Sequence, residues 1–297
     1  GTLEGSAAAG NRLDQEMLAQ ALEAAAGADV VLFFAGNNRE VETEGADRMN
    51  IILPSLQDEL IRKIAEVNEN IVTVVVTGAP VDLRTIRTCS KAMLVSWFNG
   101  SEAGNALADV LLGTVVPSGK LPFTFPVRLE DSPAYALQTY PNYDKAHYSE
   151  DIYVGYRWFD SRKIDPLYPF GHGLSYTTFE YDSPRTGKST YRARDVVTVT
   201  FNLTNTGKYP AREVVQLYVH RPGSNVEFPE NELKAFRDVE LKPGKSARIT
   251  LKVPVNQLMY WNEAAGDWAL EPGEVELRIG SSSRDIRLKK NITLRGF

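Results

Sequence analysis

Up to residue 112, short apolar runs alternate with stretches in which apolar residues recur at helical spacing. The apolar runs, rich in β-branched and aromatic residues, are Val30–Ala35, Ile71–Thr77 and Ala92–Phe98. The helical patterns are Leu13–Ala26, Leu56–Asn68 and Ala103–Leu112. Strands that alternate with helices in this way predict a parallel α/β layer. The stretch Ala28–Gly36 is so uniformly apolar that it predicts a strand covered on both faces.

From about Val196 the pattern changes to alternation of apolar and polar residues, which is typical of half-buried strands. Such stretches are Val197–Leu203, Val214–Val219 and Ala247–Val253. Turn residues separate them, as in Asn205–Gly207, Lys242–Gly244 and Glu271–Gly273. Several short strands with regular turns predict a β-sandwich.

The stretch between these two regions, Pro117 to Pro169, is rich in Pro, Tyr and Asp and has no sustained periodicity. It is typical of a long linker laid over a surface. The predicted organisation is therefore an α/β domain at residues 1–130, an inter-domain linker at 131–180 and a β-sandwich domain at 181–297.

Composition is that of a globular protein of about two domains, with 43% hydrophobic and 24% charged residues and a formal net charge of −5 over 297 residues. No block of Lys and Arg is present, which argues against a nucleic-acid or membrane partner and favours a neutral small molecule.

The single cysteine, Cys89, excludes an intrachain disulfide. His147, His172 and His220 show no metal-ligand spacing, so neither a metal nor a cofactor is expected.

A loop that follows the first predicted strand gathers carboxylates at Glu40, Glu42, Glu44 and Asp47. Active loops of parallel α/β sheets lie at the carboxyl ends of strands, so this grouping indicates acid/base chemistry. Surface glutamates usually only contact solvent, and that alternative applies to each of the three.

The segment Glu44–Arg48, followed by Leu53-Pro54 and Gln57–Ile61, resembles the acid/base loop of glycoside hydrolase family 3. Further stretches resemble the same family in family order: Ser96–Ala106, Val110–Thr124, Tyr153–Asp160 and Pro169–Thr177. In that family the general acid/base glutamate precedes Gly-x-Asp-Arg, so the matching residue is Glu44. The resemblance implies a three-layer α/β sandwich with a mostly parallel sheet, followed by a fibronectin type III-like β-sandwich.

The resemblance also implies the activity, which is hydrolysis of terminal non-reducing β-linked sugars, foremost β-glucosides. A retaining glycosidase needs a second carboxylate about 5 Å from the first. In the family this nucleophile is an aspartate in a Ser-Asp-Trp-type motif of an N-terminal barrel, and neither motif nor barrel occurs here. The chain is therefore expected to be the C-terminal part or a subunit of such an enzyme, inactive until a missing segment or second chain supplies the barrel.

Several alternatives remain at this stage. Glu42 and then Glu40 follow Glu44 as candidates for the acid/base, while Asp47 and Arg48 are expected to brace the loop. A β-xylosidase of the same family and a non-catalytic carbohydrate-associated scaffold are the competing functions. For Trp97, Phe98 and Trp158, core packing is expected rather than sugar contact. The sequence does not indicate a cellular compartment.

Overall fold

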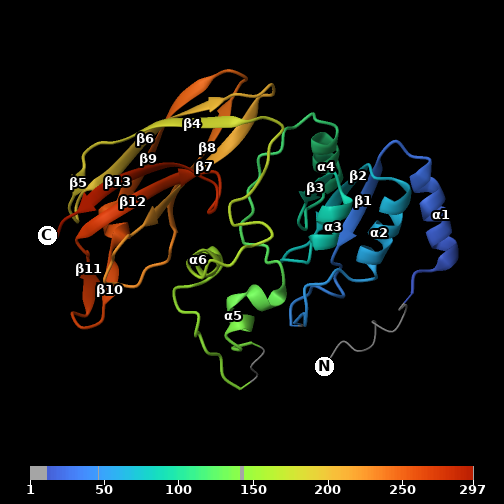
Figure 1. Ribbon diagram of the computed structural model, residues 1–297, viewed down its shortest axis with the longest axis horizontal. Coiled ribbons are helices and arrows are strands. Elements are labelled where there is room, and N and C mark those ends of the chain that lie inside the picture. Colours follow the sequence, from blue (N-terminus) through green and yellow to red (C-terminus); the bar gives the residue numbers. More distant parts are fainter. Residues whose placement is uncertain (1–11, 46, 141–143, 297) are drawn as a thin grey trace. The chain divides into compact units, whose positions relative to one another are not determined.

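The structure, a computed structural model, describes residues 12–45, 47–140 and 144–296 (Figure 1). Residues 1–11, where the first predicted domain starts, and Ala46 of the predicted acid/base loop lie outside the described residues. The chain forms two compact units. The α/β unit runs to residue 108 and includes 125–129; the sandwich unit comprises residues 109–124 and 130 onward.

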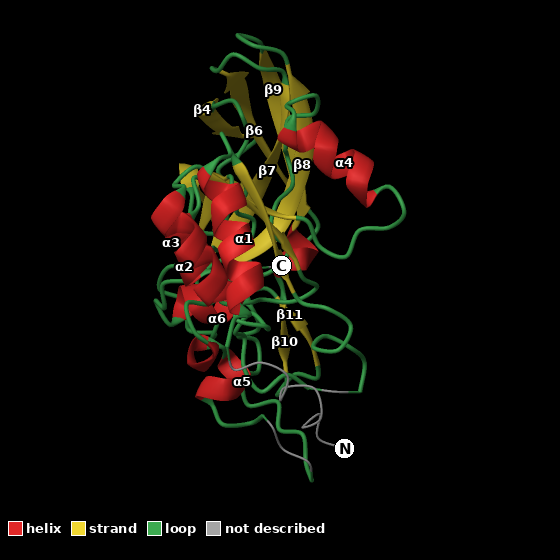
Figure 2. Cartoon of the chain, turned by 90° about the vertical axis from the view of Figure 1, so that its right-hand side faces the viewer, coloured by secondary structure: helices red, strands yellow, loops and turns green. Residues whose placement is uncertain are grey.

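The α/β unit is built on a parallel sheet with the order β1-β2-β3, made of Val31–Gly36, Ile71–Val76 and Ala92–Val95. Its helices are α1 (Gln15–Ala26), α2 (Gln57–Val67), α3 (Arg84–Cys89) and α4 (Ala103–Leu111). Helix α1 begins where the Asp14 side chain accepts a hydrogen bond from the Met17 amide at 2.9 Å. Helix α2 packs against both α1 and α3, and Figure 2 shows the three helices together.

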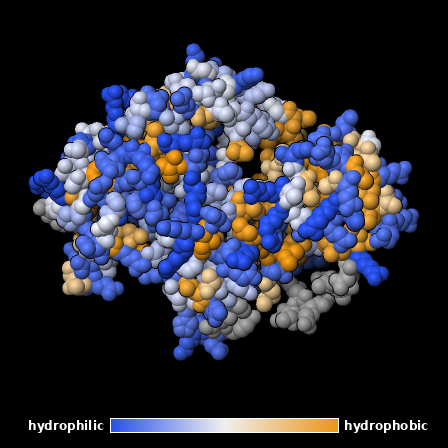
Figure 3. Space-filling view, in the orientation of Figure 1, coloured by the Kyte–Doolittle hydropathy of each residue, from blue (hydrophilic) through white to orange (hydrophobic). Residues whose placement is uncertain are grey.

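Strand β1 is covered on one face only within the described structure. Phe33 and Ala35 are buried, whereas Leu32 and Phe34 are 49% and 58% exposed. The prediction of a strand covered on both faces was wrong within the described residues, because β1 buries only alternate residues and its other face is uncovered. In Figure 3 apolar surface is accordingly more extensive over the α/β unit than over the sandwich unit.

The sandwich unit contains two sheets, antiparallel except for one short parallel pairing. One sheet has the order β4-β6-β9, formed by Phe179–Thr186, Val196–Asn205 and Ser246–Pro254. The other has the order β5-β13-β12-β7-β8, formed by Thr190–Tyr191, Ile286–Leu294, Gly273–Gly280, Ala211–His220 and Glu232–Leu241. The parallel pairing is that of β5 with β13. Alternate residues of both sheets meet in one core, as with Phe201 and Leu203 from β6 and Leu217 from β7.

Part of the stretch predicted as a linker packs on the sandwich. The stretch carries the short helices η1 (Leu129–Asp131), α5 (Pro133–Ala136) and α6 (Tyr156–Ser161). The Tyr156 ring stacks on Phe170 at 4.7 Å and meets Tyr218 of β7 edge-on at 5.9 Å. Strand β7 is therefore buried on both faces, with Gln216 and Tyr218 beneath this segment.

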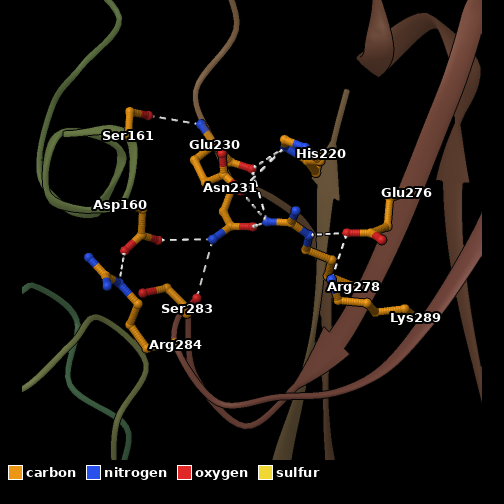
Figure 4. Close-up of polar contacts among 10 residues, drawn as sticks. All are labelled: Asp160, Ser161, His220, Glu230, Asn231, Glu276, Arg278, Ser283, Arg284 and Lys289. Atoms are coloured by element: carbon orange, nitrogen blue, oxygen red, sulfur yellow. Dashed lines mark hydrogen bonds and ion pairs between the residues drawn. The ribbon is translucent and has the colours of Figure 1, made fainter. Parts of the chain in front are cut away.

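A buried polar network joins α6 to the sandwich (Figure 4). The Asp160 carboxylate accepts hydrogen bonds from Arg284 Nε and, at 3.1 Å, from Asn231 Nδ2. Asn231 Oδ1 accepts a bond from Arg278 Nη1 at 2.8 Å, and Arg278 also contacts Glu230 at 2.8 Å. Burial raises the pKa of Asp160, although the bonds from Asn231 and Arg284 act in the opposite direction.

No helix in the described ranges is long and apolar enough to cross a membrane. The residues that the structure describes also contain no cluster of metal-ligating side chains.

Candidate active site

The carboxylate-bearing loop begins where β1 ends, and its first residue is fixed by backbone geometry. Gly36 has φ +147°, and a side chain there would lie 1.9 Å from the Val76 carbonyl oxygen, so only glycine fits. The Gln57 side chain at the start of α2 holds Gly36 on both sides: its Oε1 accepts from the Gly36 amide at 2.7 Å, and its Nε2 donates to the Gly36 carbonyl at 2.9 Å. The two ends of the loop are thereby brought together.

Glu42 anchors the middle of the loop. Its Oε2 accepts a hydrogen bond from Asn37 Nδ2 at 2.8 Å and lies 3.2 Å from Thr77 Oγ1. Its Oε1 accepts from the Gly78 amide at 3.0 Å. Because both oxygens already accept a hydrogen bond from the protein itself, from Asn37 and from Gly78, Glu42 fits the role of an anchor better than that of a proton donor.

The segment that leads from the loop towards α2 is also held in place. Arg48 Nη2 donates to the Pro80 carbonyl at 3.1 Å, as expected of a residue that braces the loop. Ile51 and Leu53 are buried, and the Ile51 carbonyl accepts from the Asp82 amide at 2.6 Å. The loop is therefore held at its start, its middle and its return.

Glu44 lies on a turn between these anchors, and its side chain is exposed. Gly45, which follows it, has φ +78° and so supplies the left-handed conformation of that turn. Within the described residues Glu44 makes no side-chain hydrogen bond or ion pair, in contrast to Glu42. Glu40 and Asp47 are exposed as well, and the Glu40 amide donates to Asn38 Oδ1 at 2.9 Å.

The three strands bring different groups to the same edge of the sheet. β1 is followed by the loop, β2 by Thr77 and Gly78, and β3 by Trp97 and Phe98. The space beside Gly78 is shared by Glu42 Oε1 and the Phe98 ring, which would lie 2.6 Å and 3.1 Å from a side-chain carbon built there. Phe98 is 52% exposed, so the expectation of core packing was wrong for this ring. It was right for Trp158, which is 7% exposed.

A second pair of carboxylates, which sequence reasoning missed, lies where α2 and α3 begin. Burial and then the charge of Asp82 raise the pKa of Asp58. Burial also acts to raise the pKa of Asp82, but hydrogen bonds from Arg84 outweigh it and the net shift is downward. Asp58 Oδ1 is buried without a hydrogen-bond partner among the described residues. No sequence motif marks this pair, because it arises only when the two helix starts meet in space.

Family models match most of the chain. Residues 2–176 match the glycosyl hydrolase family 3 C-terminal domain, and residues 213–283 match a fibronectin type III-like domain. The first match continues into residues that belong to the sandwich unit of the structure.

The chain is similar to curated β-glucosidases. It is 42% identical over 280 residues to thermostable beta-glucosidase B of Acetivibrio thermocellus, covering 94% of this chain and 37% of that protein. It is 41% identical over 272 residues to beta-glucosidase BoGH3A of Bacteroides ovatus, covering 90% of this chain and 36% of that protein. The chain thus spans a little over a third of the length of these relatives.

Solved structures share the fold. The GH3 beta-glucosidase of Bifidobacterium adolescentis superimposes with a TM-score of 0.89 at 40% identity, covering 95% of this chain and 41% of that one. The beta-glucosidase of Kluyveromyces marxianus in complex with glucose also gives 0.89, at 36% identity, covering 96% and 35%.

The family models for the α/β layer with its fastened carboxylate loop and for the β-sandwich define a modular protein of the glycoside hydrolase class. The chain belongs to glycosyl hydrolase family 3, of which it comprises the C-terminal domain and the fibronectin type III-like domain. The resemblance and the fold class predicted from the sequence are confirmed. The role of Glu44 and the boundaries 1–130, 131–180 and 181–297 stay predictions.

Proposed function

We propose that this chain supplies Glu44 as the general acid/base of a retaining β-glucosidase that acts on terminal non-reducing β-D-glucosyl residues. The proposal rests on the difference between two glutamates of the same loop, Glu42 and Glu44. Glu42 is bound on both oxygens, by Asn37 and by Gly78, while Glu44 is presented on a turn with its carboxyl group unoccupied by other described residues. The fastened loop thus exposes Glu40, Glu44 and Asp47, and of these only Glu44 directly precedes Gly-x-Asp-Arg.

The chemistry requires two carboxyl groups about 5–5.5 Å apart. Glu44 would protonate the glycosidic oxygen as the bond to the anomeric carbon breaks, while an aspartate attacks that carbon to form a glycosyl ester. Glu44 would then take a proton from the water that hydrolyses the ester. We assign the aspartate to a barrel outside these 297 residues, either on the same protein or on a partner chain.

The exposed position of Glu44 fits this division of the site. A general acid must hold its proton near neutral pH, which requires partial burial or a neighbouring carboxylate. Contact with the barrel and the bound sugar would provide that enclosure. The small β-glycoside, rather than a nucleic acid or a membrane, is therefore the proposed partner of the loop.

The test is hydrolysis of an alkyl β-glucoside by the whole enzyme and by its Glu44→Gln variant. Because an acid/base contributes about 10²–10⁴ in rate, kcat should fall by about that factor. Glu40→Gln is the matched control on the same loop and should leave kcat close to wild type. Equal losses in both variants, or none in Glu44→Gln, would remove Glu44 from this role.

The names of the relatives, all β-glucosidases, favour glucose over xylose as the sugar. A β-xylosidase of the same family stays the second candidate. The ratio of kcat/KM for aryl β-glucoside and aryl β-xyloside separates the two, and a ratio above one supports the proposal. The scaffold alternative predicts no cleavage of either sugar by the whole protein.

A further inference from the structure

Two tryptophans form an exposed pair on a hairpin that belongs to neither sheet of the sandwich. The hairpin consists of β10 (Tyr260–Asn262) and β11 (Asp267–Ala269), in which Trp261 and Trp268 lie directly opposite each other. Their ring centroids are 5.9 Å apart and the ring planes are nearly perpendicular. Trp261 is 52% exposed and Trp268 57% exposed, so both rings present apolar surface to solvent.

The opposite side of the hairpin is fastened to the sandwich. Tyr260 meets Phe228 edge-on at 6.2 Å, and the Arg221 guanidinium lies 3.9 Å from the centre of the Phe228 ring. The preceding helix η2 (Val255–Leu258) is anchored by the buried side chains of Val255 and Leu258. The tryptophan pair is therefore held on a fixed support.

A hollow of about 410 Å³ lies next to the base of this hairpin. Its apolar lining includes Val196, Pro254 and Met259, and its polar lining includes Arg194, Asp195 and Asn256. Met259 has extended backbone (φ −79°, ψ 158°) and leads directly into β10. Met259, which lines the hollow, thus lies two residues before Trp261 in the chain.

The polar lining combines acceptors and donors. The Asp195 carboxylate is positioned by Lys188 Nζ at 2.7 Å and by the Arg192 amide at 2.6 Å. The guanidinium of Arg194 has no acceptor within the part of the chain that the structure describes. Asn256 adds an exposed amide, which can donate and accept.

This combination suits a carbohydrate better than a lipid, a peptide or an anion. A pyranose has an apolar face that packs on aromatic rings and a rim of hydroxyl groups that both donate and accept hydrogen bonds. The ring pair on the hairpin offers the apolar contact, and the lining of the hollow that adjoins the start of β10 adds apolar and polar contacts. The volume also falls within the range of small-molecule sites.

We propose that this surface, formed by Trp261, Trp268, Met259, Arg194, Asp195 and Asn256, binds a β-linked glucan chain outside the catalytic site. The choice of a β-glucan as ligand rests on the proposed function. The surface would hold the polymer near the enzyme without taking part in cleavage.

The test is native affinity electrophoresis of the 297-residue chain in gels that contain soluble mixed-linkage β-glucan, with cellohexaose binding measured by calorimetry. Wild type should be retarded by the glucan, and Trp261→Ala should weaken binding about tenfold, as expected when an aromatic anchor is lost. Phe236→Ala is the matched control, because Phe236 is 68% exposed on β8 of the same unit but belongs neither to the hairpin nor to the lining of the hollow.

A cross-strand tryptophan pair also stabilises a hairpin by itself, so a variant outside the hairpin is required. Asn256→Ala should weaken glucan binding while leaving the melting temperature unchanged. The proposal is overturned if wild type is not retarded, or if Trp261→Ala and Asn256→Ala are retarded as strongly as wild type. The two proposals can fail independently. Retardation by the glucan tests the tryptophan surface and does not depend on Glu44. The comparison of hydrolysis by wild type and Glu44→Gln tests the proposed function and does not depend on Trp261.

Discussion

At the residue scale, the carboxylate loop depends on two glycines, because a side chain at either position would collide with neighbouring atoms. Gly36 avoids the Val76 carbonyl, and Gly78 leaves space for the carboxylate of Glu42 and for the Phe98 ring. The sequence shows these glycines after two strands but no nucleotide-binding motif around them. Their purpose became clear only with the structure, because the close contacts involve residues distant in the sequence.

Gly78→Ala should displace the Glu42 carboxylate, since the added carbon would lie 2.6 Å from Glu42 Oε1. The loss of a charge-assisted hydrogen bond costs about 1.5–3 kcal/mol, so residues 37–45 should exchange amide hydrogens faster than in wild type. Gly100→Ala is the control, because no atom lies within 4 Å of the carbon it adds. Unchanged exchange in Gly78→Ala would show that Glu42 is not the anchor of the loop.

At the element scale, hydrophobic periodicity located the strands of the α/β layer, three strands of the sandwich and the long helices within a few residues. Helix α2 was predicted at Leu56–Asn68 and spans Gln57–Val67. β3 was predicted to reach Phe98 but ends at Val95, because Trp97 takes the left-handed conformation with φ 58°. The short helix α6 was missed, since it is fixed by contacts distant in the sequence, such as those of the buried Asp160 with Asn231 and Arg284.

The network around Asp160 predicts a pH dependence for the stability of the sandwich unit (Figure 4). Burial raises the pKa of Asp160 above its usual 3.8, so between that value and the raised pKa the folded state binds the proton more tightly than the unfolded state. The stabilising contribution is therefore full below pH 3.8 and falls as the pH rises through the folded-state pKa.

Urea unfolding of wild type and Asp160→Asn over a pH series measures this contribution. The difference in unfolding free energy, wild type minus variant, should decrease from its value near pH 3.8 as the pH rises, and then become constant. An increase with pH would mean that the bonds from Arg284 and Asn231 outweigh burial.

At the scale of the whole molecule, the chain covers 37% and 36% of the length of two β-glucosidases that it resembles. Its α/β unit provides the acid/base loop that we propose, while a complete retaining site needs a second carboxylate. The sequence predicted this division through the family motifs alone, since composition and periodicity contain no information on a missing nucleophile.

The isolated 297-residue chain should accordingly leave an aryl β-glucoside intact. Adding the part of the enzyme that carries the nucleophile should restore cleavage, and intact mass should show both parts in the active complex. Cleavage by the isolated chain at a rate comparable to that of the whole enzyme would place both carboxylates within this chain.

The most direct test of the role of Glu44 is the dependence of the whole enzyme on the leaving group. An alkoxide must be protonated as it departs, whereas dinitrophenolate is stable enough to leave without an acid. If Glu44 is the acid/base, Glu44→Gln should slow the first step by about 10²–10⁴ with an alkyl β-glucoside but far less with dinitrophenyl β-glucoside. An equal loss with both substrates would contradict the assignment, because a residue that only supports the loop affects every leaving group alike.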